Sequence, residues 1–168
     1  MKGQVVTDSN ANHFSGFEDH YTPLAKFAYL VTGNMDIAQE LAHEVLLRAS
    51  EALLDFRASH ARAYLRTTVM NLWRRRLRRR GMEAMALVRI GSPSLSNDWP
   101  DSVDDRDVIW RALRKLPYGS RVCVVLRYYE DLSLSEIARE TRLPVGTVKS
   151  RISRALKRLA TYLESEHE

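Results

Sequence analysis

The sequence is poor in the residues that crosslink small proteins or build catalytic centres. Its 168 residues include a single cysteine, Cys123, which excludes an internal disulfide and a zinc cluster of cysteines. Cys123 lies in the apolar run 122–126, where we expect a buried and unreactive thiol. The pair His43-Glu44 lacks the second histidine of an H-E-x-x-H zinc motif. We therefore expect neither a metal nor another cofactor, and no enzymatic activity.

Long apolar segments and strand-like alternation are also absent. The sequence has no signal peptide and no segment long enough to span a membrane, so we expect a cytoplasmic protein without membrane insertion. It has no internal repeat and no run of alternating polar and apolar residues long enough for a sheet. An apolar content of 45% is nevertheless sufficient for a packed core. The predicted fold class is all-α.

Charges of opposite sign occupy different parts of the chain. The formal net charge is +5 and the isoelectric point is about 9.6. Residues 62–80 contain eight arginines and no acid, whereas residues 98–107 contain five aspartates and only one arginine. Such segregation indicates that different segments meet different partners.

Two helical blocks flank a segment that is rich in turn-forming residues. Glycine, serine, proline and asparagine interrupt the helical pattern between residues 81 and 103, which predicts a flexible linker. We expect a disordered N-terminus over residues 1–13 and a helical domain over 14–80. A second helical domain, which carries a helix-turn-helix, is expected over 104–164. Each domain is near the lower size limit for an independent core.

Residues 131–158 have the pattern of a complete helix-turn-helix. Ser133 and Glu136 form a capping-box signature, which predicts a helix from Leu134. Residues 142–144, Arg-Leu-Pro, end that helix, and a second helix is predicted from Val145.

The second helix has two chemically distinct sides. Its predicted buried side consists of Val145, Val148, Ile152, Leu156 and Leu159. Its other side consists of Thr147, Ser150, Arg151, Arg154, Lys157 and Arg158. Hydroxyl and cationic groups on a second helix favour insertion into a DNA major groove. The alternative is an amphipathic surface helix whose basic side is only solvated.

A second candidate surface lies on a predicted helix over residues 61–80. Leu65, Val69, Leu72 and Trp73 form its buried side. A stripe on another side consists of Tyr64, Thr67, Asn71, Arg74, Arg75 and Arg78. An aromatic ring beside hydrogen-bonding and guanidinium groups suits single-stranded nucleic acid. The alternative is that the aromatic residues belong to the core and the arginines form a solvated basic end.

A third candidate surface lies on a predicted helix over residues 36–54. Its inner side consists of Ala38, Leu41, Ala42, Val45, Ala49 and Ala52, and its outer side of Glu40, His43, Glu44, Leu47 and Glu51. An exposed leucine among acids suggests a protein partner with basic and partly apolar character. The alternative is an isolated surface leucine among acids that only solubilise the helix.

Four segments in order resemble a known family. They are residues 36–49, residues 63–66 with Asn71-Leu72, residues 116–129, and residues 145–151. Together they resemble the minimal two-domain type of bacterial extracytoplasmic-function sigma factor, in the sigma-70 family. The resemblance extends from about residue 14 to residue 163. It implies that the protein is a promoter-specificity subunit whose partners are promoter DNA and the β′ and β subunits of core RNA polymerase.

The resemblance implies a role for each surface. The contacts to the clamp of the polymerase β′ subunit would be Glu40, His43, Glu44 and Leu47. The −10 DNA contacts would be Tyr64, Thr67, Asn71, Arg74, Arg75 and Arg78, and the loop 56–60 would receive a flipped base. The −35 DNA contacts would be Thr147, Lys149, Ser150, Arg151, Ser153, Arg154 and Arg158, with Arg151 and Arg158 on phosphates. The acidic linker would enter the positively charged channels of the polymerase.

The resemblance also leaves differences and open alternatives. Gln39 and His43 stand where the family commonly has an acid and a glutamine, and Tyr64 stands where a tryptophan is common. An anti-sigma protein is a further partner that the resemblance implies, although no residue identifies one. The alternative function is a polymerase-independent helix-turn-helix regulator, with the first domain used for dimerisation or effector sensing.

Overall fold

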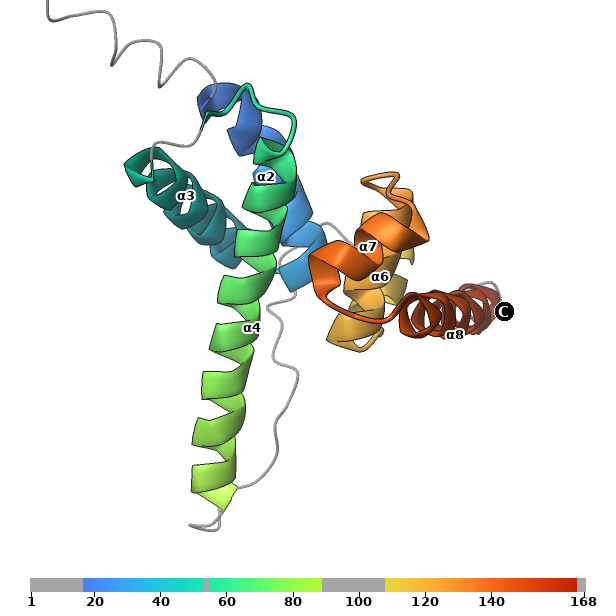
Figure 1. Ribbon diagram of the computed structural model, residues 1–168. Coiled ribbons are helices and arrows are strands. Elements are labelled where there is room, and N and C mark those ends of the chain that lie inside the picture. The colour runs from blue at the N-terminus through green and yellow to red at the C-terminus, as the bar shows by residue number, and fades with distance from the viewer. Residues whose placement is uncertain (1–16, 53–54, 89–107, 166–168) are drawn as a thin grey trace, which may run out of the picture. The chain divides into compact units, whose positions relative to one another are not determined.

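The chain forms two helical units. The computed structural model describes residues 17–52, 55–88 and 108–165 (Figure 1). One compact unit lies within residues 1–99 and the other within residues 100–168. Every regular element in the described ranges is an α-helix, which confirms the predicted all-α class with two helical domains. The expected disordered N-terminus and residues 89–103 of the expected linker lie outside the described residues.

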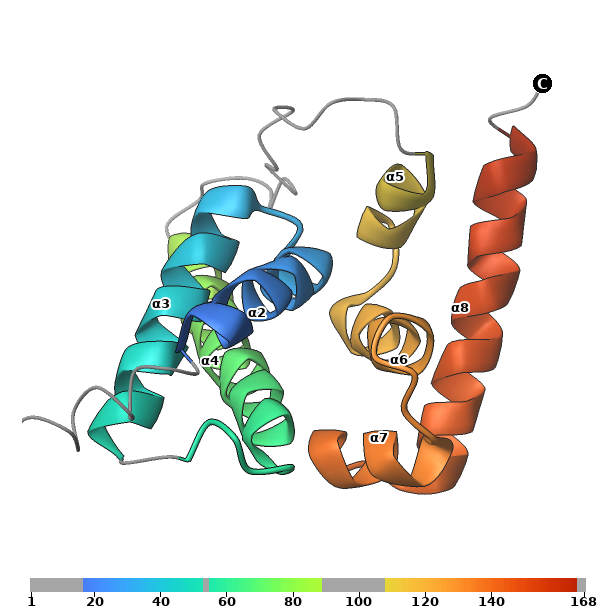
Figure 2. The ribbon, with the colours of Figure 1, turned by 90° about the horizontal axis from the view of Figure 1, so that it is seen from above.

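The N-terminal unit consists of α2 (Phe17–Thr32), α3 (Met35–Glu51) and α4 (Ala61–Val88), and each helix packs against the other two. Large side chains from all three helices meet in its core. Phe27 of α2, Leu41 and Leu46 of α3, and Leu65 and Met70 of α4 are almost completely buried. The view in Figure 2 shows these three helices crossing one another.

A two-residue turn sets the packing of α2 against α3. Gly33 has a φ of 73°, in the left-handed region that a residue without a side chain reaches most easily. Asn34 then caps α3, because its Oδ1 accepts a hydrogen bond of 2.9 Å from the N–H of Ile37. The Thr32 side chain is buried and its hydroxyl is within 3.3 Å of the N–H of Asn34.

The inner side of α3 differs from its prediction at one end. Five of the six predicted inner residues are buried, but Ala52 is exposed. The reason is that α3 ends at Glu51, and Ala52 forms its C-terminal cap with its N–H bonded to the Arg48 carbonyl. Leu46, which the pattern left unassigned, is completely buried.

The helix α4 is longer than its sequence pattern predicts. We expected it to end at Arg80, with a separate short helical turn within residues 82–90, yet α4 continues without a break to Val88. One glycine inside a helix costs only about 1 kcal/mol relative to alanine. The residues after Gly81 include alanine, methionine, leucine and glutamate, which favour helix and offset that cost. The expected linker therefore begins with two turns of helix.

The C-terminal unit consists of α5 (Val108–Arg114), α6 (Tyr118–Tyr128), α7 (Leu134–Thr141) and α8 (Val145–Ser165). The helix α6 is the centre of the unit, because every residue from Arg121 to Leu126 is buried. A helix that is buried on all sides must be covered by its neighbours. The helices α7 and α8 both pack on α6, and α8 also contacts α5 and α7.

The helix-turn-helix has the predicted boundaries. Ser133 caps α7, and both hydrogen bonds of its capping box with Glu136 are present. Arg142 ends α7 in the left-handed region with a φ of 57°, and α8 begins at Val145. In Figure 2, α7 lies across the beginning of α8.

The buried side of α8 is rotated relative to its prediction. Val148 and Ile152 are buried and Leu159 is half-buried, but Val145 is 45% exposed and Leu156 is 41% exposed. Ala155, which the prediction omitted, is buried. The buried stripe therefore consists of Val148, Ile152 and Ala155. Packing against α5, α6 and α7 selects it, because the small Ala155 lets α8 approach these helices more closely than a leucine would.

Candidate functional site

The four candidate residues on α3 share one face of that helix. Glu40, His43, Glu44 and Leu47 recur every three or four residues and all reach the surface. The Leu47 side chain is 57% exposed, which is a large apolar area for a surface position.

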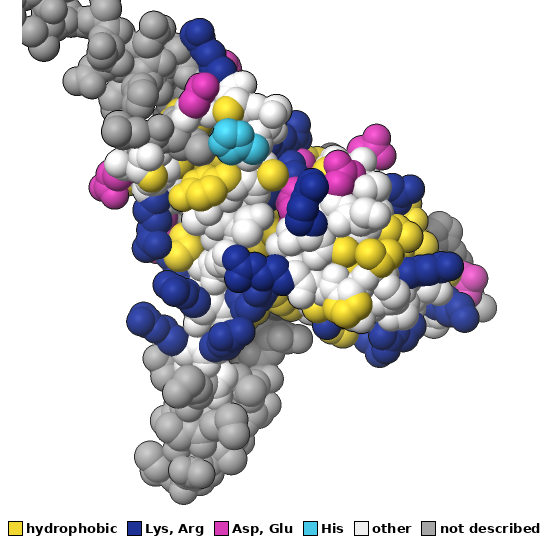
Figure 3. Space-filling model, in the orientation of Figure 1, with side chains coloured by type: hydrophobic (Ala, Val, Ile, Leu, Met, Phe, Trp, Pro, Cys, Tyr) yellow, Lys and Arg dark blue, Asp and Glu magenta, His cyan; other side chains and the backbone are white. Residues whose placement is uncertain are grey.

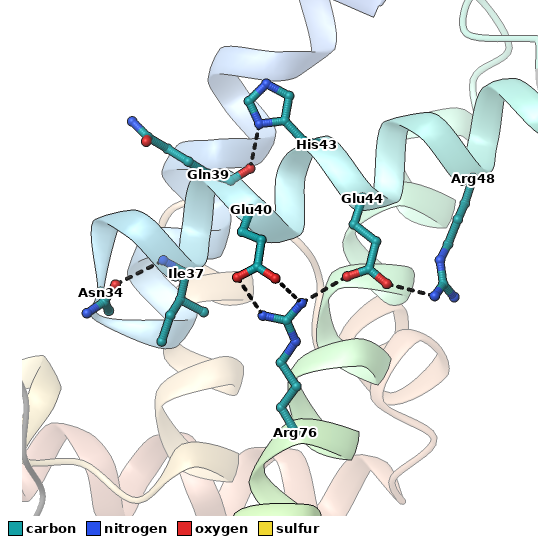
Figure 4. A network of polar contacts seen from close by, with 8 residues as sticks. All are labelled: Asn34, Ile37, Gln39, Glu40, His43, Glu44, Arg48 and Arg76. Atoms are coloured by element: carbon teal, nitrogen blue, oxygen red, sulfur yellow. Dashed lines mark hydrogen bonds and ion pairs between the residues drawn. The ribbon is translucent and has the colours of Figure 1, made fainter.

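An arginine of α4 joins the two glutamates of this face (Figure 4). The guanidinium of Arg76 donates two hydrogen bonds to the Glu40 carboxylate, at 2.9 Å and 3.1 Å. The same guanidinium donates to the Glu44 carboxylate at 2.9 Å, and Arg48 donates to the other oxygen of Glu44 at 2.7 Å. The hydrogen bond to Glu40 is the main reason that the pKa of Arg76 is raised. Two acids and two bases therefore form a neutral cluster.

His43 lies on the opposite flank of the same face. Its Nδ1 donates to the Gln39 carbonyl oxygen at 2.9 Å, and its ring lies 4.7 Å from the ring of Tyr21 in α2. The α3 face is thus tied to α4 through the glutamates and to α2 through the histidine. Leu47 lies between these flanks.

The predicted single-strand stripe follows the exposed face of α4. Tyr64 is 41% exposed and Asn71 is exposed, whereas Thr67 is half-buried. Arg74 is half-buried, and Arg75 and Arg78 are exposed. Lys and Arg side chains gather around the middle of α4 in Figure 3. All six residues of the stripe reach the surface of a continuous helix, as base stacking and phosphate contacts require.

The loop before α4 is anchored to the unit. Phe56 is buried, and its carbonyl oxygen accepts a hydrogen bond of 2.8 Å from His20 Nε2 in α2. Asp55 accepts a hydrogen bond of 2.9 Å from the N–H of Arg57. The exposed residues Ser59 and His60 are thereby held beside the first turn of α4. Sequence reasoning missed His20, because its partner lies 36 residues away.

The basic side of α8 is open to solvent. Lys149, Ser150, Ser153, Arg154 and Arg158 are exposed, and Thr147 is half-buried. Among the described residues, the Arg154 guanidinium donates hydrogen bonds to neutral groups of Ser150, at 3.2 Å and 3.3 Å. In the described part of the chain, no ion pair involves Lys149, Arg154 or Arg158.

Arg151 occupies a different environment from its neighbours on α8. It is half-buried, and a Cβ atom added to Gly119 of α6 would lie 2.5 Å from its guanidinium. Burial raises the pKa of the Cys123 thiol, and the nearby Arg151 partly opposes that change. Arg151 thus lies against α6, at the edge of the open basic face. Cys123 is a buried free thiol, as expected.

The described residues hold no group of three or more metal-ligating side chains. None of their helices combines the length and apolarity needed to cross a membrane. The exposed faces of α3, α4 and α8 offer hydrogen-bonding groups, an aromatic ring and charged groups.

Comparison with known proteins identifies the class. Residues 17–82 match the family model of sigma-70 region 2, and residues 106–159 match that of sigma-70 region 4. The chain is 31% identical over 156 residues to the ECF RNA polymerase sigma factor SigL of Mycobacterium tuberculosis, across 88% of this chain and 86% of that protein. This chain belongs to the ECF RNA polymerase sigma factors, as its sequence segments indicated.

Further similar proteins support the same family assignment. The chain is 31% identical over 151 residues to the ECF sigma factor SigE of Mycolicibacterium smegmatis, but it spans only 58% of that protein and 86% of itself. A solved structure of the sigma factor RpoE from Bartonella quintana, in complex with the anti-sigma factor NepR, shares the fold. Its TM-score is 0.68 with 24% identity, over 88% of this chain and 94% of that one.

Proposed function

We propose that this chain is a promoter-specificity subunit of bacterial RNA polymerase, with a separate task for each unit. The observation that carries the proposal is the combination of two matched sigma regions with an exposed face of basic and hydrogen-bonding side chains on each, α4 in one and α8 in the other. Sigma factors regulate transcription and are not themselves enzymes. The chemistry of RNA synthesis therefore belongs to the core polymerase.

The C-terminal unit would read the −35 duplex. Its capping box fixes the start of α7, and α8 then presents Lys149, Ser150 and Arg154 toward solvent from its first turns. The beginning of a recognition helix lies deepest in the major groove, where such side chains reach base edges. Arg158 would contact a phosphate. Arg151 would do so only from the edge of the face, because its guanidinium lies against α6.

The N-terminal unit would hold the unpaired −10 strand. Tyr64 supplies an exposed ring for stacking, and Asn71 supplies an amide on the same face two turns later. Thr67 lies between them, and Arg74, Arg75 and Arg78 follow toward the end of the stripe. Stacking on one ring contributes about 1–3 kcal/mol per base, which offsets a cost of a few kcal/mol for unstacking that base.

The face of α3 would dock on the β′ clamp through Glu40, His43, Glu44 and Leu47. The two glutamates are already neutralised by Arg76 and Arg48, so they are poor attractors of a distant basic partner. Leu47 would then supply apolar contact, and the outward oxygens of the glutamates would accept further hydrogen bonds. An anti-sigma protein that bound this face would compete with the polymerase.

The test is multi-round transcription with purified bacterial core polymerase, a pool of candidate promoters, and this chain present or absent. We expect transcripts that depend on both the chain and the promoter sequence. Co-elution with core polymerase is measured in parallel. Tight operator binding by the chain alone, with neither transcripts nor co-elution, would support an independent regulator instead.

A further inference from the structure

A groove between α3 and α4 gathers arginines from both helices. Its volume is about 500 Å³. Arg48 lines it from α3, while Arg75 and Arg79 line it from successive turns of α4, and Leu72 contributes an apolar patch to its wall. Arg48 and Arg79 belong to none of the three contact sets expected from the sequence. Only the packing of α3 on α4 brings Arg48 beside the arginine run.

Among the described residues, the positive charge in this groove is only partly balanced by acids. Glu44 is the single acid among the described residues that line it, and that acid is shared between Arg48 and Arg76. Arg75, Arg78 and Arg79 also line the groove, and no ion pair with another described residue involves them. Three neighbouring guanidinium groups that have no ion pair with a described residue repel one another. An anion in the groove would remove that repulsion.

We infer that this groove binds a backbone phosphate of a DNA strand through Arg48, Arg75 and Arg79, and that Glu44 links this binding to docking on the polymerase. The inference rests on the proposed function and names a contact of the same N-terminal unit. Guanidinium groups suit a phosphodiester because their planar N–H donors match its oxygens. Arg75 and Arg78 also belong to the stripe on α4, so a strand on that stripe reaches the groove without a gap.

Glu44 gives the site its link to the polymerase. Its carboxylate holds the Arg48 guanidinium at 2.7 Å, and the same side chain belongs to the α3 face proposed for docking. A basic group of the polymerase that bonds to Glu44 would release Arg48 toward the groove. Docking would then strengthen phosphate binding, and phosphate binding would strengthen docking by the same factor.

The first experiment measures binding of the full chain to fluorescent single-stranded DNA of promoter and of random sequence, by anisotropy at several salt concentrations. The variants are Arg48→Gln and Arg79→Gln. The control Lys26→Gln removes one exposed charge from α2, outside the groove. Each groove variant should reduce the slope of log affinity against log salt by about 0.7, and the affinity by about fourfold at 0.15 M salt. The loss should be equal for both sequences, and Lys26→Gln should change neither quantity.

The second measurement tests the link through Glu44. Glu44→Gln should tighten DNA binding by about fourfold, because it frees one guanidinium for phosphate. The gain should disappear in the double variant with Arg48→Gln. An equal gain in both backgrounds would disprove the link, although not the phosphate site.

Three results would overturn the phosphate site itself. The first is that the unaltered chain binds no DNA at low salt. The second is that neither groove variant changes the salt slope. The third is that the groove variants lose no more DNA affinity than Lys26→Gln does. Competition with inorganic tripolyphosphate separates DNA from a free anion, since displacement at micromolar tripolyphosphate would mark a small-anion site. If the chain supports promoter-dependent transcription but the groove variants leave the salt slopes unchanged, the proposed sigma function holds and only the phosphate site in this groove is rejected.

Discussion

The two units present their charged side chains in opposite ways. On α3 of the N-terminal unit, the outward glutamates Glu40 and Glu44 are paired with arginines of the same unit. On α8 of the C-terminal unit, the exposed Lys149, Arg154 and Arg158 have no ion pair in the described part of the chain. A paired charge stabilises its own fold and attracts a partner weakly, whereas an unpaired charge is available to a phosphate or a base. The comparison suggests different kinds of partner for the two surfaces.

The same contrast exists within the N-terminal unit. The α3 face combines a neutral charge cluster with the exposed Leu47, as expected for a protein contact. The exposed face of α4 combines an aromatic ring with arginines, as expected for nucleic acid. Arg76 belongs to the arginine run of α4 but bonds to α3, so one side chain of that run serves the fold.

The largest expected effect tests whether the two units are independent. Ile137 is completely buried in α7, and Ile137→Ala should destabilise the C-terminal unit by about 2–5 kcal/mol. Calorimetry should show one transition moved to lower temperature and a second, from the N-terminal unit, left in place. A single transition that shifts as a whole would mean that the units unfold together.

The next effect separates DNA opening from polymerase docking. Tyr64→Ala should weaken capture of an unpaired −10 base by about 1–3 kcal/mol, since it removes a stacking surface. Permanganate reactivity of the promoter should fall, while affinity for core polymerase stays the same. Tyr64→Phe is the matched control and should retain most of the function, because it keeps the ring. Equal losses of opening and docking would contradict the division between α4 and α3.

Arg154 and Lys157 of α8 should make different kinds of contact with DNA. Arg154→Ala should cost about 1–3 kcal/mol at one position of the −35 element and relax specificity there. Lys157→Ala, at an exposed position farther along α8, should weaken all sequences by a similar amount. Affinities for a set of single-base −35 variants measure both effects. A uniform loss for Arg154→Ala would reassign it as a phosphate contact.

A smaller effect concerns the local stability of the helix-turn-helix. Ser133→Ala removes the two hydrogen bonds that the Ser133 hydroxyl makes with Glu136 and should lower the stability of the C-terminal unit by about 0.5–2 kcal/mol. Ser135→Ala is the matched control, because Ser135 is exposed inside α7 and caps nothing. Urea unfolding followed by circular dichroism compares the two variants, and equal stabilities would show that the cap contributes nothing measurable.

The smallest expected effect tests the paired cluster on α3. The Glu40 side chain is 64% exposed, so Glu40→Gln should cost less than about 1 kcal/mol of stability despite two hydrogen bonds to Arg76. Thermal unfolding at low and high salt measures the difference, which should shrink as salt rises. A loss of several kcal/mol would instead make this cluster a main support of the α3–α4 packing.

The accuracy of the sequence-based expectations depended on how local each feature is. The capping box of Ser133 and Glu136 was predicted correctly because its two residues lie three positions apart on the same turn. The buried sides of α3 and α4 were also largely correct, since helical periodicity alone defines them. The stripe on α8 was wrong at Val145 and Leu156, because a wheel cannot show how closely α5, α6 and α7 approach.

The sequence by itself determined the family, the helix-turn-helix and the three candidate faces, because each depends on patterns within short segments of the chain. The tertiary structure alone decided which charges remain available. Arg76 meets Glu40 across 36 residues, and Arg48 meets the arginines of α4 in the groove between the two helices. Pairing of charges depends on distances of a few ångströms between helices, and only the packed core of each unit sets those distances.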